Sequence, residues 1–178
     1  MPTRRTFLAA GVAGATALAA AGWWRSSRDA IPVLVGTAPG PRLAPDALAV
    51  LTAVAPVLLE GALPDDPAAA RAAVQTTVAN IGVAVAGLPP AAQEELGQLF
   101  ALLGFPPTRI ALARVTSPWP QAPRDEITAF LDHWRTSRFL LLHSAYSALH
   151  QLVFAAWYGN PESWPAIGYP GPPKLAAQ

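Results

Sequence analysis

The sequence predicts an all-α fold, a compact bundle of about five helices. Beyond residue 45, apolar residues recur at spacings of three and four over most of the chain, as they do on one face of a helix. No stretch shows the sustained two-residue alternation, with β-branched residues, that is typical of strands. Proline and glycine stand where the apolar periods begin and end. With 178 residues, the chain has the length of one ordinary domain.

We expect four successive parts. Residues 1–21 are predicted to be an export signal, residues 22–44 a linker, residues 45–160 the helical domain, and residues 161–178 an extended, irregular C-terminal strap rich in proline and aromatic residues. Only 13% of the residues are charged, about half the usual share in a soluble domain. A surface so poor in charge favours contact with a partner or a membrane.

The N-terminus resembles a twin-arginine export signal. Arg4 and Arg5 precede Phe7 and Leu8, and no further charge follows before Arg25. The apolar region is mostly Ala and Gly, which suits this kind of leader better than a strong transmembrane helix. We therefore expect export to the periplasm by the twin-arginine translocase.

A cleavage site of small residues ends at Ala21. Cleavage there removes Arg4 and Arg5, so the twelve basic residues fall to ten against eleven acidic ones. If the leader stays uncleaved, Trp23 and Trp24 would lie at headgroup level and hold the protein at the inner membrane. The mature part contains no basic stripe, and we expect no nucleic-acid partner.

The first helix of the domain is expected to begin near Pro45 and to end at Gly61. Pro56 should kink it, because proline removes a backbone donor. One apolar stripe follows helical spacing along this segment and consists of Leu48, Leu51, Ala55, Leu58 and Leu59.

Two further helices are predicted by their termini. The second opens at the Asp-Asp-Pro of 65–67 and runs to about Gly87, since acidic residues and proline suit a first helical turn. The third follows Pro89 and Pro90 and stops at Gly104. Its expected buried residues are Leu96, Leu99, Phe100 and Leu103. A short helical piece is expected over 108–115.

The last part of the domain is predicted to hold a loop and two helices. Residues 117–123 contain three prolines and should form a wrapping loop. The helix that opens at Asp125 places four apolar residues on one side, namely Ile127, Phe130, Leu131 and Trp134. A final helix over 137–158 is apolar on nearly every face and is capped by Gly159. Such a helix lies at the centre of its domain or against a neighbour, and we take it as the centre of the bundle.

The sequence indicates no catalytic, cofactor or metal site on this chain. It contains no cysteine, which excludes disulfides, covalent c-type haem attachment and cysteine-ligated iron–sulfur clusters. No glycine-rich nucleotide motif follows a predicted strand. Its histidines are His133, His143 and His150. The last two lie about 10 Å apart along one helix, too far to share a metal ion.

A hydrolytic triad of Ser144, His150 and Asp132 can be drawn from the sequence. Ser144, however, would lie inside a helix, without the sharp turn that exposes a nucleophile. We therefore expect no enzyme activity from this chain alone. An enzyme that uses His143 or His150 stays a third hypothesis, which predicts activity from the purified single chain.

The C-terminal region resembles the end of a known group of small subunits. The runs are Ala-Trp-Tyr-Gly-Asn-Pro at 156–161 and Trp-Pro-Ala-Ile-Gly-Tyr-Pro-Gly-Pro-Pro at 164–173. They are similar to those of gluconate 2-dehydrogenase subunit 3-like proteins and of the related gamma subunits of membrane-bound sugar and alcohol dehydrogenases. The leader is of the same kind as in that group. The resemblance covers the leader and roughly the last fifty residues.

The resemblance implies a periplasmic heteromer, associated with the inner membrane through the complex. A large FAD-binding subunit of the GMC oxidoreductase kind would carry the chemistry and the cofactor, and a multihaem cytochrome c often accepts the electrons. The small subunit, without a cofactor of its own, would support folding and export. Proteins exported by the twin-arginine route are typically loaded with a cofactor first, which also favours a partner that shares this leader.

Five residues are expected to contact the partner: Trp157, Tyr158, Asn160, Trp164 and Tyr169. Large aromatic residues in segments fixed by proline bury much area at little entropic cost. The alternative for each is packing within its own domain. The alternative function is a stand-alone exported helical protein that binds a small apolar ligand or a lipid in its bundle.

Overall fold

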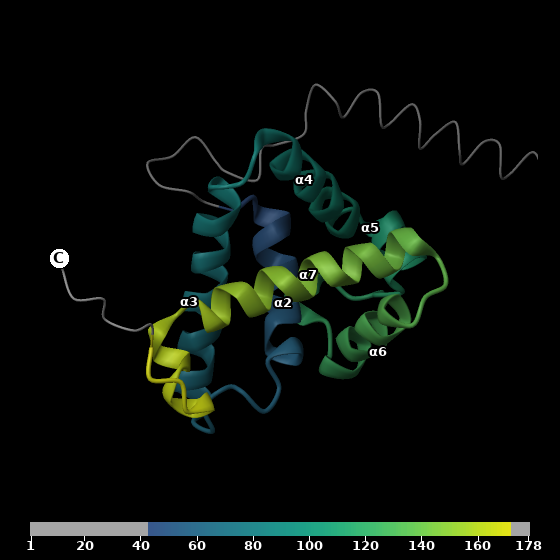
Figure 1. Ribbon diagram of the computed structural model, residues 1–178. Helices are drawn as coiled ribbons and strands as arrows, with labels where there is room; N and C mark the ends of the chain where they lie inside the picture. The colour runs from purple at the N-terminus through teal and green to yellow at the C-terminus, as the bar shows by residue number, and fades with distance from the viewer. Residues whose placement is uncertain (1–42, 172–178) are drawn as a thin grey trace, which may run out of the picture. The chain divides into compact units, whose positions relative to one another are not determined.

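The computed structural model describes residues 43–171 (Figure 1). Over this range the chain has six α-helices and short helical turns, and no strand, so the all-α prediction is confirmed. The predicted export signal, with Arg4, Arg5, Phe7 and Leu8, the linker up to residue 42, and the last seven residues lie outside the described range.

The α-helices are α2 (Pro45–Leu58), α3 (Pro67–Ala86), α4 (Pro90–Gly104), α5 (Pro106–Thr108), α6 (Arg124–Arg135) and α7 (Leu140–Tyr158). The π-helical turn η1 (Arg109–Ala113) follows α5, and three 3-10 turns are η2 (Trp119–Gln121), η3 (Pro161–Ser163) and η4 (Pro165–Ile167). Four of the six α-helices begin with proline. Proline has no backbone N–H, and at the first helical position this N–H would have no partner within the helix. Before α3, the Asp66 carboxylate also accepts the Ala69 N–H at 2.7 Å.

The central helix is α2, which packs against α3, α4, α6, α7 and η2. Its buried residues are Ala47, Val50, Leu51, Val54 and Ala55. The predicted stripe is therefore correct at Leu51, Ala55 and Leu59, which are buried, and wrong at Leu48, which is exposed. Leu58 is partly buried. The helix continues through Pro56 as far as Leu58, and Gly61 follows in a left-handed conformation, with φ +78°.

Against expectation, α7 is not the centre of the bundle. It begins at Leu140, packs mainly on α3 and α6, and crosses one face of the described unit (Figure 1). Its buried residues are Leu149, Val153, Ala156 and Trp157. At its start, Phe139, Leu140 and Leu141 are 67%, 79% and 80% exposed. The all-round apolar character of this helix thus leaves apolar surface uncovered.

The other predicted elements are present with small differences. All four predicted apolar residues of α6 are buried. In α4, Phe100 and Leu103 are buried, whereas Leu96 and Leu99 are only partly covered. The proline-rich loop buries Trp119, whose Nε1–H donates to the Leu103 carbonyl at 2.8 Å.

Two buried or partly buried charges hold the connection between η1 and α6. The Arg109 guanidinium is buried and donates to the carbonyls of Val115 and Thr116, both at 3.2 Å. The backbone N–H and the hydroxyl of Thr116 in turn donate to the Glu126 carboxylate, and these bonds lower the pKa of Glu126. The loop is thereby fixed to both neighbouring elements.

Candidate functional site

An apolar groove separates α4 from α7. It has a volume of about 590 Å³. Since α4 rests mainly on α2, while α7 rests on α3 and α6, the two helices stand as opposite walls. The wall on the α4 side and one end of the groove are formed by Ala84, Leu88, Ala92, Glu95, Leu96 and Leu99. The α7 wall is formed by Leu141, Ser144, Ala145, Ala148, Gln151, Leu152 and Ala155.

The α7 wall is one continuous helical face. Its residues follow one another at spacings of three or one from Leu141 to Ala155, which corresponds to about 21 Å of helix. Three polar side chains face the groove: Glu95, Ser144 and Gln151. Among the described residues, none donates to or accepts from these side chains, and Glu95 is the one charged residue of the lining. The groove is therefore apolar and contains one carboxylate, which has no partner within residues 43–171.

The groove is continuous with an exposed apolar patch. We call Phe139, Leu140 and Leu141 the start patch of α7, and Leu141 belongs to both features. No motif in the sequence marks these three residues as a contact site. The apolar character of α7 on every face indicated that some apolar surface could stay uncovered. Only the packing of α3 and α6 against this helix shows which face is covered.

Another face of α7 carries a ladder of aromatic rings. Tyr146, His150, Phe154 and Tyr158 follow at four-residue spacing, and the central pair, His150 and Phe154, stack with centroids 4.1 Å apart. Tyr146 and His150 also line a small pocket of about 230 Å³ with Asp132 and Arg135. The ladder gives His150 a packing role.

The residues of the hypothetical triad do not meet. His150 and Asp132 line the small pocket, whereas Ser144 faces the groove beside α4. The Asp132 carboxylate accepts from the Arg135 guanidinium at 3.0 Å. The Ser144 hydroxyl therefore does not share a site with His150 and Asp132.

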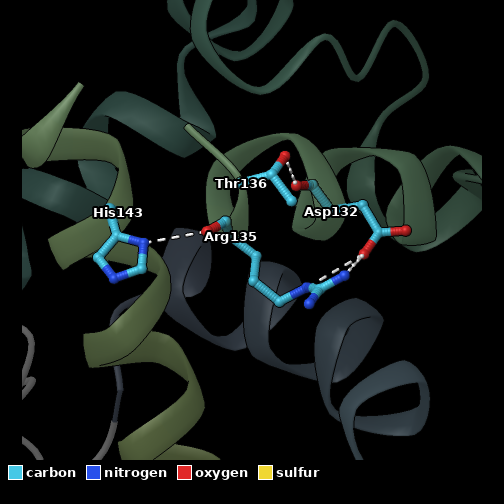
Figure 2. A network of polar contacts seen from close by, with 4 residues as sticks. All are labelled: Asp132, Arg135, Thr136 and His143. Carbon is cyan, nitrogen blue, oxygen red and sulfur yellow. Dashed lines mark hydrogen bonds and ion pairs between the residues drawn. The ribbon is translucent and has the colours of Figure 1, made fainter. Parts of the chain in front are cut away.

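His143 joins α7 to the end of α6 (Figure 2). Its Nδ1–H donates to the Arg135 carbonyl at 3.0 Å, and the Thr136 hydroxyl donates to the Asp132 carbonyl at 2.7 Å. A donor placed there satisfies a carbonyl that the last turn of α6 leaves without a helical partner. The contacts of His143 are structural.

The predicted contact residues of the C-terminus are divided by the structure. Trp157 is only 6% exposed and belongs to the core. The Asn160 side chain accepts the Glu162 N–H at 3.2 Å and caps η3. Tyr158 and Tyr169 are exposed, and Trp164 is partly exposed. Of the five residues, Trp157 alone is buried, and the other four, with Asn160 partly exposed, keep surface that a partner can reach.

The described part of the predicted strap is not extended. Residues 161–167 form η3 and η4. The Trp164 Nε1–H donates to the Tyr158 carbonyl at 2.8 Å, and the Tyr169 ring meets the Trp164 ring edge-on, with centroids 5.2 Å apart. Prolines at the first position of both turns favour this winding, since their φ is already near the helical value. The segment folds back on the end of α7.

Comparison with known proteins does not identify the function of this site. No protein-family model, curated protein or solved structure matches this chain. Within residues 43–171, no three His, Asp or Glu side chains gather as a metal site would require. Over the same range, no single helix has the length and apolar character to cross a membrane, although Pro90–Gly104 and Pro106–Ala113, bent by 83°, pass that test together. The candidate site is the groove with the start patch of α7.

Proposed function

We propose that this chain is the non-catalytic small subunit of a periplasmic flavoprotein dehydrogenase. It would escort a large FAD-binding subunit of the GMC kind through the twin-arginine route and stabilise it afterwards. FAD would be held by that partner, and a multihaem cytochrome c would be a further subunit. The observation that carries the proposal is the uncovered apolar surface of α7, its start patch together with the groove.

Apolar area left in water is unfavourable by roughly 25 cal/mol per Å², so a continuous uncovered area favours a permanent partner. Phe139 and Leu140 are among the most exposed large apolar side chains of the described range. Aromatic and large aliphatic residues of this kind are the usual anchors of an interface. The resemblance of the C-terminus and the leader to small dehydrogenase subunits names the class of partner.

The test is co-expression with a flavin dehydrogenase that is encoded beside this chain and lacks its own leader. We expect the two chains to elute together from a sizing column and dehydrogenase activity to reach the periplasm. Arg4→Lys with Arg5→Lys should keep that activity in the cytoplasm, while the matched change Arg25→Lys with Arg28→Lys should not. Periplasmic activity that survives the first double variant would contradict the export role.

The groove also favours a second candidate, the binding of an apolar small molecule or lipid by a stand-alone protein. Its volume of about 590 Å³ lies within the range of about 300–1,000 Å³ typical of ligand pockets. Native mass spectrometry of the purified single chain distinguishes the two candidates. A soluble monomer that retains a small ligand supports binding, and a chain that is stable only with the dehydrogenase supports the subunit.

A further inference from the structure

We propose that the groove between α4 and α7 receives one helix of the partner subunit, which presents an apolar face and a single Lys or Arg opposite Glu95. This inference rests on the proposed function, because it names the element by which the escorted subunit is held.

The shape of the groove fits a helix. Its α7 wall is about 21 Å long, the length of about fourteen helical residues. Ala145, Ala148 and Ala155 have small side chains that project little from this wall. Another helix can therefore approach to the axis-to-axis distance of about 8–10 Å that is typical of packed helices. An added β-strand would need an exposed sheet edge, and residues 43–171 contain no sheet. A helix in a groove is the recognition mode that fits an apolar wall of this length.

The charge of the groove requires a basic residue on that helix. Glu95 is the one charged residue of the lining, and no described side chain pairs with it. An apolar helix laid over this carboxylate would remove its water, which is unfavourable in the absence of a countercharge. A Lys or Arg on the incoming helix offsets that cost and fixes the register of the helix.

A second copy of this chain is a poorer occupant. The apolar helix that such a copy would offer is its own α7, and this helix contains no Lys or Arg. It would therefore lay an apolar face over Glu95 without a Lys or Arg as countercharge. A self-contact remains a distinguishable outcome of the test below.

The test uses the full chain co-purified with the co-expressed flavoprotein, with a photo-crosslinking residue placed in turn at Ser144, Ala148 and Gln151. We expect the cross-linked positions on the flavoprotein to advance by three or four residues along one helix. Adducts in loops, adducts to a second copy, or no adducts in an intact complex would overturn the inference and leave the proposed function standing. Absence of any complex on the sizing column would overturn both.

Charge reversal gives the matched control. Glu95→Lys should weaken the complex about tenfold or more, the usual size for a paired charge that loses its partner. Glu94→Lys changes the charge equally at the neighbouring position outside the groove and should alter affinity less than about twofold. Changing the mapped basic residue of the flavoprotein to Glu should restore binding to Glu95→Lys. Equal losses from the two variants would show that Glu95 has no specific partner.

Discussion

Helices α6 and α7 are neighbours in the chain and in space, yet they use their apolar residues differently. In α6, four apolar residues occupy one side and all are buried, while Asp125, Asp132 and Arg135 face solvent. In α7, apolar residues surround the helix and only one face is covered. Helix α6 buries its apolar residues within its own domain, whereas α7 leaves apolar surface that the described residues do not cover.

The largest expected effect concerns the buried side of α6. Phe130 is fully buried and meets the rings of Trp119 and Trp134 edge-on, at centroid distances of 5.5 and 4.7 Å. Phe130→Ala should lower the free energy of unfolding by about 3–5 kcal/mol, measured by urea denaturation. Leu140→Ala, at the exposed start of α7, should change it by less than about 0.5 kcal/mol. A similar loss from both would abolish the contrast between the helices.

The next effect concerns the uncovered side of α7. Ala148→Phe places a ring in the groove without removing any contact within the chain. We expect the free energy of unfolding to stay nearly constant and the affinity for the proposed dehydrogenase subunit to fall about tenfold or more, since the ring would occupy the space proposed for the partner helix. The measurement is a titration of the two purified subunits. Ala129→Phe on the exposed side of α6 is the control, and an equal loss of affinity there would contradict the proposed site.

A smaller effect is expected where the two helices meet. His143→Ala removes the donor to the Arg135 carbonyl and should lower the free energy of unfolding by about 0.5–1.5 kcal/mol. His143→Gln keeps a donor and should recover part of the loss. If the alanine variant is as stable as the parent in thermal unfolding, this contact does not hold the two helices together.

The smallest effect depends on pH and arises on α6. Hydrogen bonds from Thr116 lower the pKa of Glu126 below its ordinary value of 4.5, so the ionised carboxylate stabilises the folded state. This stability is present above pH 4.5 and is lost as the pH falls through the lowered folded pKa. Glu126→Gln should therefore be less stable than the parent at pH 7, and urea denaturation at successively lower pH should show the two converging. A constant difference would exclude this origin.

Much of the fold could be predicted because its helix ends are marked by local chemistry. Pro67 and Gly87 bound α3, and Pro90 and Gly104 bound α4, as expected from the sequence. The register of α2 could not be predicted in full, since most of its residues are apolar and both Ala47 and Leu48 could belong to a stripe. Packing by the surrounding helices selects Ala47, whose small side chain lets them approach closely.

The candidate site was less predictable. Its walls come from helices about fifty residues apart in the chain, and no spacing in the sequence shows that α4 and α7 face each other. At the C-terminus, Tyr158 and Tyr169 are exposed, and contact of these residues with a partner stays a prediction. The richness of aromatic residues did not indicate the bond from Trp164 to the Tyr158 carbonyl. That bond closes a turn over six residues, a pairing that composition alone does not specify.

The prolines that open α2, α3, α4 and α5 also act on the chain before it folds. Each ring restricts φ in the unfolded ensemble while costing the helix no hydrogen bond. The entropy lost on folding is reduced by as much as about 0.4–1 kcal/mol at each compatible position. Part of the stability of this helical unit therefore comes from conformations that the unfolded chain cannot adopt. Replacing these prolines would weaken the fold without removing a backbone hydrogen bond of a helix.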